Sequence, residues 1–110
     1  MADFTFKHDP ENRTLRIALH TAKFDAAHTQ PFLAAIKDDW PTPVNRVELD
    51  LEAVTFIDSS GVGALLTLAK RLPTDADPVL LKNPGEQVTG VLELLRLQRI
   101  FRFQNEQPMK

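Results

Sequence analysis

The segment that most constrains the fold of this chain is residues 47–72, VELDLEAVTFIDSSGVGALLTLAKRL. Its first part alternates apolar and acidic residues, which is the two-residue period of a half-buried strand. Its last part places apolar residues at a helical period, which is the pattern of one buried stripe: Val62, Leu65, Leu66, Ala69 and Leu72. Between the two parts stand three residues that favour helix N-caps, Asp58, Ser59 and Ser60. The sequence therefore predicts a strand, a short turn, and a helix that begins within the turn.

Two glycines, Gly61 and Gly63, follow in the first turn of this predicted helix, where each costs about 1 kcal/mol relative to alanine. Glycine is expected at these positions if another backbone or a partner protein approaches the helix closely, or if the surface around the serines has to be free of side chains. A helix N-terminus also favours a negative group, so a phosphate on Ser59 or Ser60 would be well placed. An ordinary strand-to-helix turn with a serine cap accounts for the same residues and remains the alternative at this point.

Length and composition bound the class of protein. The 110 residues predict a single domain, 1–110, with 104–110 as a frayed polar tail. A net charge of −2 argues against non-specific nucleic-acid binding, and the absence of cysteine excludes a disulfide scaffold and fits a reducing compartment. The N-terminus lacks the apolar core of a signal peptide, and no apolar run is long enough to span a bilayer. We expect a soluble, cytoplasmic protein without membrane insertion.

The first part of the chain predicts a hairpin and a helix. Two alternating apolar runs, 4–6 and 15–19, flank the polar turn 9–12, which indicates two antiparallel strands. A helix is then expected after an N-cap at Thr29, with Pro31 in the first turn, where its missing N–H costs nothing.

The last part of the chain predicts one more strand–helix–strand unit. Residues 79–81 form a short, continuous apolar strand. Asn83 is the expected N-cap of the third helix, with Pro84 at its first position, and residues 100–103 form the last strand. The order β-β-α-β-α-β-α-β predicts an α/β fold with a mixed sheet of four or five strands and three helices packed chiefly on one side.

The segment FIDSSGVGALL resembles the signature of the STAS domain, the fold of the anti-sigma factor antagonist family. In that family an apolar strand leads into an Asp-Ser-Ser/Thr-Gly-Leu/Val-Gly turn and then an apolar helix. The resemblance covers nearly the whole chain and implies a STAS-like mixed sheet. In the regulatory members, the serine directly after the aspartate is phosphorylated by a cognate anti-sigma factor that is itself a kinase. By motif position that phosphoacceptor is Ser59, with Ser60 as the alternative.

The turn before the first helix carries a second part of the resemblance. Phe24-Asp25 and residues 29–32 match the family pattern, whereas Ala22-Lys23 stands where the family has Gly-Glu, which bears on partner specificity. The resemblance implies a partner-binding surface formed by the capping and turn residues: Asp25, Asp58, Ser59, Ser60, Gly61, Val62 and Gly63.

The function that the resemblance implies is a phospho-switchable binding module. With Ser59 unphosphorylated, the module docks on an anti-sigma factor serine kinase and the sigma factor is released. Phosphorylation adds about −1.5 to −2 charge units at the contact, and a serine phosphatase restores binding. The alternative is a STAS subunit of a membrane transporter complex or a signalling scaffold, with no sigma factor involved.

The sequence contains few of the residue patterns that an enzymatic function would require. Asp58, Ser59 and His28 would supply the residue types of a Ser-His-Asp triad. However, neither serine has the glycine two residues before it that a Gly-x-Ser-x-Gly nucleophile elbow requires. The three histidines, His8, His20 and His28, show no metal-ligand spacing. No catalytic residue, cofactor or metal site is predicted, and a small hydrolase is the rival with least support.

Two further groups of residues are interpreted as structural or solvent-exposed, without a functional role. Arg96, Arg99 and Arg102 are interpreted as solvated arginines near a helix end and an edge strand. Trp40 and the seven phenylalanines are interpreted as core residues, and Phe24 is named as one that could be partly exposed and serve as a contact anchor.

Overall fold

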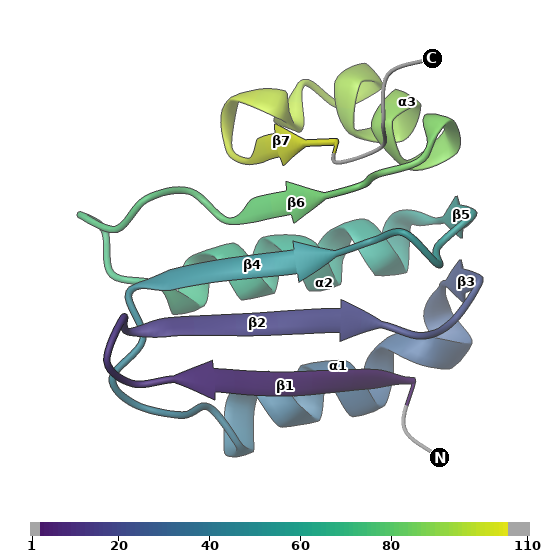
Figure 1. Cartoon of the computed structure of the whole chain (residues 1–110). Helices are drawn as coiled ribbons and strands as arrows, with labels where there is room; N and C mark the ends of the chain where they lie inside the picture. The colour runs from purple at the N-terminus through teal and green to yellow at the C-terminus, as the bar shows by residue number, and fades with distance from the viewer. Residues whose placement is uncertain (1–2, 106–110) are drawn as a thin grey trace.

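A computed structural model describes residues 3–105 of the chain. Its main layer is a five-stranded sheet, and two long helices run behind that sheet (Figure 1). The strands follow the spatial order β1 (Phe4–Asp9), β2 (Thr14–Leu19), β4 (Arg46–Asp50), β6 (Leu80–Lys82) and β7 (Arg102–Gln104).

The first two strands form an antiparallel hairpin, and every later neighbour pair in this sheet is parallel. The parallel strands are connected through the helices α1 (Ala26–Asp38), α2 (Ser59–Arg71) and α3 (Glu86–Leu94). The predicted α/β fold, with a mixed sheet and three helices chiefly on one side, is confirmed.

The hydrophobic core lies between the sheet and these helices. Alternate residues of the central strands are almost fully buried, as the two-residue period predicts: Leu15, Ile17, Leu19, Val47 and Leu49. Phe32 of α1 packs edge-on against Phe24, with ring centroids 5.3 Å apart, a favoured arrangement for aromatic pairs. Phe24 is only 1% exposed, so the suggestion that it forms a contact anchor on the surface is wrong.

Helix α1 begins earlier than its predicted cap. Asp25, not Thr29, is the N-cap: its side chain accepts a hydrogen bond from the backbone N–H of Ala27 at 3.2 Å. Its backbone carbonyl accepts from the N–H groups of His28 and Thr29 at 2.9 and 3.0 Å. The N–H groups of the first turn therefore find their acceptors at a cap four residues earlier than predicted. Thr29 is buried, and Pro31 lies inside the helix instead of in its first turn.

The C-terminal elements also differ from the prediction. Helix α3 has Gly85 as its N-cap, without a side-chain hydrogen bond, because Asn83 adopts a left-handed φ of 57° and turns the chain before the helix. A short 3-10 helix, η1 (Leu97–Arg99), precedes β7. Gln104 pairs with Lys82 in the sheet and so is not part of a frayed tail, and residues 106–110 of the predicted tail lie outside the described residues.

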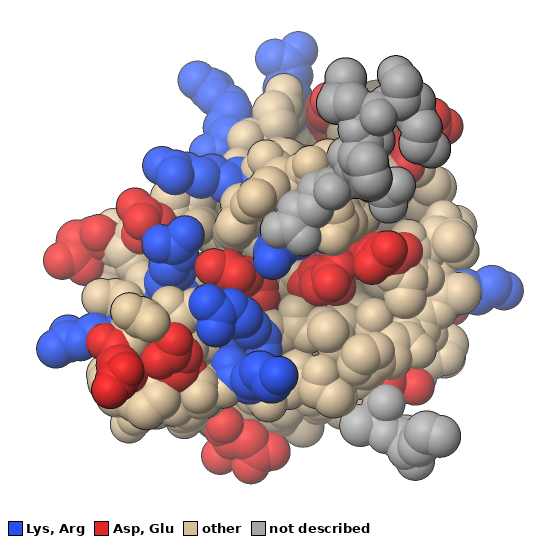
Figure 2. Space-filling model, in the orientation of Figure 1, with Lys and Arg blue, Asp and Glu red and all other residues tan. Residues whose placement is uncertain are grey.

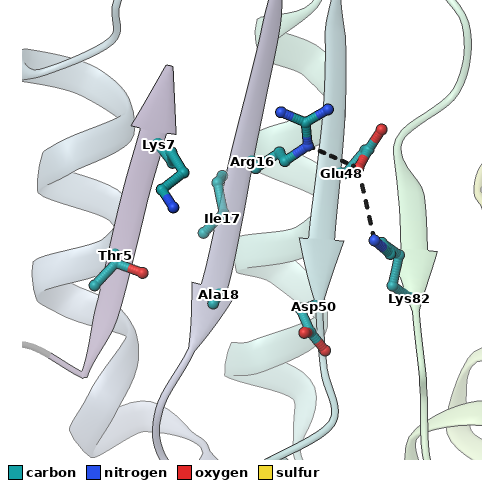
Figure 3. Close-up of a pocket in the computed structure, with 8 residues that line it drawn as sticks. All are labelled: Thr5, Lys7, Arg16, Ile17, Ala18, Glu48, Asp50 and Lys82. Atoms are coloured by element: carbon teal, nitrogen blue, oxygen red, sulfur yellow. Dashed lines mark ion pairs between the residues drawn. The ribbon is translucent and has the colours of Figure 1, made fainter. Parts of the chain in front are cut away.

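The second face of the sheet carries charged side chains instead of helices (Figures 2 and 3). Parallel sheets are usually covered on both faces, so this face needs another way to remain in water. Glu48, in the central strand, lies 3.3 Å from Arg16, 3.6 Å from Arg46 and 3.8 Å from Lys82. Its carboxylate joins three strands in one charge network.

This network predicts the effect of neutralising its centre. The substitution Glu48→Gln leaves the cations of Arg16 and Arg46 without their shared carboxylate, and we expect it to lower the free energy of unfolding by about 1 kcal/mol. The loss should shrink in high salt, because Arg16 and Arg46 are about half exposed and salt screens their attraction to Glu48. Urea unfolding at two salt concentrations measures it, with Asp75→Asn in an exposed loop as the control. An equal loss in both variants would contradict the prediction.

Candidate functional site

The candidate site is built on a second, very small sheet. Strands β3 (Lys23–Phe24) and β5 (Phe56–Ile57) pair in parallel, and each is followed at once by an aspartate that caps a helix. Asp25 caps α1 and Asp58 caps α2. Because the two strands are in register, the N-termini of both helices lie at the same end of the molecule (Figure 1). Sequence periodicity did not predict this two-residue sheet.

Asp58 fixes where α2 starts. Its side chain accepts a hydrogen bond from the N–H of Gly61 at 3.0 Å, and its carbonyl accepts from the N–H of Val62 at 2.9 Å. Its backbone is extended, as in most N-cap residues. The helix therefore begins at Ser59, and the prediction that it begins within the turn is confirmed.

The two serines differ in accessibility. Ser59 is the first residue of α2 and is exposed, whereas Ser60 is half-buried. Within residues 3–105 the hydroxyl of Ser59 has no hydrogen-bond partner, so the chain itself does not occupy it. Of the two candidate phosphoacceptors, Ser59 is the one open to another protein.

The two glycines have different roles. Gly61 is buried, and a Cβ there would overlap the carbonyl oxygen of Phe24 and the side chain of Ile57. The close approach suggested by the sequence is therefore made by the chain's own backbone. Gly63 is exposed, and a Cβ there would meet nothing within 4 Å.

The predicted partner-binding residues consequently divide into a surface and its support. Ser59 and Gly63 lie on the surface, and Asp25, Asp58 and Ser60 are half-buried beside it. Gly61 is buried beneath the surface, and so is Val62, which is 6% exposed and belongs to the core.

Gln87 of α3 is a supporting residue that sequence reasoning missed. Its side-chain amide accepts from the N–H of Ile57 at 2.8 Å and donates to the carbonyl of Ile57 at 3.1 Å. The amide thus pairs with both backbone groups of the residue before Asp58, much as a neighbouring strand would. No spacing in the sequence indicates such a contact between residues 30 positions apart.

Asp25 is held by a histidine one turn into its helix. Nδ1 of His28 donates to the carboxylate of Asp25 at 2.6 Å. This hydrogen bond holds the pKa of Asp25 below its ordinary value, against the opposing effect of burial. The carboxylate therefore stays ionised at neutral pH and keeps the N-terminus of α1 capped.

The arrangement does not assemble the catalytic or metal sites considered above. Among the described residues, no hydrogen bond joins Ser59 to His28, so the Ser-His-Asp set lacks the contact between nucleophile and base. The same part of the chain contains no group of three metal-ligating side chains and no helix long and apolar enough to cross a membrane.

Comparison with known proteins identifies the family. The family model described as the STAS domain matches residues 7–107, and the chain therefore belongs to the STAS domain family. The resemblance inferred from FIDSSGVGALL is confirmed.

Solved structures of anti-sigma factor antagonists share this fold. SpoIIAA in its unphosphorylated form is 26% identical, with a TM-score of 0.69, and the match covers 93% of this chain and 90% of that one. Bacillus SpoIIAA in its phosphorylated form is 24% identical, with a TM-score of 0.66 and coverage of 94% and 92%. A Thermotoga maritima protein, provisionally named an anti-sigma factor antagonist, is 24% identical, with a TM-score of 0.75 and coverage of 92% and 85%.

The contrast between the two glycines predicts opposite effects of the same substitution. Gly61→Ala places a methyl group against the backbone of Phe24, and we expect it to destabilise the domain by about 1–3 kcal/mol. Gly63→Ala meets open space in a helix and should stabilise it by about 0.5–1 kcal/mol. Urea unfolding of the two variants measures both, and effects of the same sign would contradict the assignment.

The contact between His28 and Asp25 predicts a pH effect. In the His28→Ala variant the pKa of Asp25 should rise towards its ordinary value, because the hydrogen bond that lowers it is gone. A depressed carboxylate pKa stabilises the fold at pH values above the ordinary pKa, and that stabilisation is lost as the pH falls through the lowered value. The variant should therefore lose its cap at a higher pH. NMR titration of the Asp25 carboxyl carbon measures the change, and an unaltered midpoint would show that His28 does not set this pKa.

Proposed function

We propose that the chain is an anti-sigma factor antagonist whose docking on an anti-sigma factor serine kinase is controlled by phosphorylation of Ser59. The observation that carries the proposal is the exposed hydroxyl of Ser59, without a hydrogen-bond partner among the described residues, at the first position of α2. Membership of the STAS domain family and the match to SpoIIAA, which is known in unphosphorylated and phosphorylated forms, support it.

On this proposal the cycle takes place in a bacterial cytoplasm. The unphosphorylated module binds the kinase over the start of α2, and the kinase then releases its sigma factor. Phosphorylation of Ser59 ends the contact, and a serine phosphatase restores it. The module is a substrate of these enzymes and performs no catalysis of its own.

The position of Ser59 explains how a phosphate would act without unfolding the domain. The free N–H groups and the dipole at the N-terminus of a helix favour a negative group, so the phosphate is compatible with α2. A partner that covers the same helix start would have to bury two negative charges without a counterion. Such a cost is several kcal/mol, enough to weaken a complex at least a hundredfold.

The neighbouring residues have supporting roles in this proposal. Asp58 and Asp25 hold the two helix starts in place, and Gly61 lets α2 lie on β3. Gly63, four residues after Ser59, lies one turn along the same side of the helix. Because it has no side chain, nothing projects there to hold a partner away from Ser59. Ser60 is the alternative acceptor.

The proposal predicts a phosphorylation pattern. Incubation with ATP and the serine kinase encoded nearest to this chain should add the mass of one phosphate to the wild type. It should add none to Ser59→Ala, whereas Ser60→Ala should still gain it. Ser59→Asp should weaken the complex with that kinase at least a hundredfold while the thermal unfolding midpoint stays close to that of the wild type.

Two results would contradict this prediction. One is phosphorylation of Ser59→Ala to the same extent as the wild type. The other is an unmodified chain that does not bind the kinase but co-purifies with the ATP-binding subunit of a transporter, which would favour the transporter or scaffold alternative.

A further inference from the structure

The connection from α3 to β7 exposes more large aliphatic surface than any other segment among residues 3–105. Leu94 is 82% exposed, Leu95 51% and Ile100 43%, and the only other large exposed apolar side chain in that range is Phe56. None of the three belongs to the buried core cluster, although Ile100 lies beside Leu72 and Val79. Burial in the core therefore does not account for the aliphatic surface that these three residues expose, above all that of Leu94.

Two inward-facing residues hold this connection in place. Leu97 packs against the core, and Phe101 is 3% exposed. Arg96 adopts a left-handed φ of 60°, which turns the chain from α3 into η1. Ile100 thus lies between two inward-facing residues, and Leu94 and Leu95 precede the first of them.

The same segment, residues 94–102, carries three arginines. Arg96, Arg99 and Arg102 are all exposed, and no carboxylate among the described residues lies within ion-pair distance of them. Arg96 and Arg99 line one shallow depression with Gln98 and Glu93, which is its only acidic member. In Figure 2, cationic side chains project from the end of the molecule at which α3 and β7 lie in Figure 1.

We propose that residues 94–102 form a peripheral docking surface for an anionic phospholipid membrane. Leu94, Leu95 and Ile100 would enter the headgroup region, as the apolar residues of interfacial segments do. Arg96 and Arg99 would bind lipid phosphates, which guanidinium groups match by paired hydrogen bonds. This surface needs no membrane-spanning helix.

The exposure of the aliphatic side chains favours a membrane over an acidic protein segment. The net charge of −2 opposes binding to any anionic partner, so the local arginines Arg96 and Arg99 have to supply the electrostatic attraction. An amphipathic partner helix is usually received in an apolar groove, whereas Leu94 projects almost fully into solvent. The proposal does not depend on Ser59 or on a kinase.

Sedimentation of the full chain with vesicles tests the proposal. The wild type should pellet with vesicles of equal parts phosphatidylglycerol and phosphatidylcholine but not with phosphatidylcholine alone, and less so in high salt. The double variant Arg96→Gln/Arg99→Gln should bind about 25-fold more weakly, about fivefold for each arginine. Glu93→Gln, which removes the nearby carboxylate, should bind more tightly than the wild type.

Control variants separate this surface from general effects. Lys37→Gln removes an exposed cation of α1 and should leave vesicle binding unchanged. Leu94→Ser/Leu95→Ser should reduce binding several-fold with little change in thermal stability, since both side chains are outside the core.

Three outcomes would overturn the proposal. The first is a wild type that does not bind the mixed vesicles. The second is an equal loss of binding in Lys37→Gln and in the double arginine variant. The third is a wild type that binds soluble polyglutamate through Arg96 and Arg99 but binds no vesicles, which would assign the surface to an acidic protein.

Discussion

The start of α2 lies directly on the backbone of Phe24, with no side chain between them, and the rest of the candidate site depends on this contact. Gly61 makes it possible, because any Cβ at that position would overlap the carbonyl oxygen of Phe24. The contact brings α2 against β3, while β3 pairs with β5, the strand that leads into α2. Strand, turn and helix therefore constrain one another within a few residues, and Ser59 has a fixed place at the helix start.

Parts of this arrangement followed from local patterns, and the rest depended on contacts distant in sequence. The alternation at 47–51 and the helical stripe from Val62 are produced by burial of one face, so periodicity predicted β4 and α2. The caps of α1 and α3 were misassigned because composition cannot choose among neighbouring capping residues. Asp25 prevails over Thr29 since its side chain and carbonyl together satisfy three N–H groups.

The site residues also divide into those indicated by local sequence and those that depend on contacts distant in sequence. Asp58 and Ser59 were found from the sequence because an N-cap and the residue after it are local features. The burial of Gly61 could not be predicted, since it results from the packing of α2 on β3, whereas the burial of Val62 followed from the helical stripe. Gln87 was also missed, because its two hydrogen bonds to Ile57 connect elements 30 residues apart. The exposure of Leu94, likewise, depends on where α3 ends against its neighbours.

The amide of Gln87 connects two parts of the chain that are distant in sequence. It joins α3 to Ile57, the last residue of β5, through two hydrogen bonds to the backbone N–H and carbonyl of that residue. Both bonds are made by one side-chain amide, so they join α3 to the residue before Asp58 at a single point. The helix whose last residue is the exposed Leu94 is therefore joined by a side-chain contact to the strand that leads into the turn of Ser59.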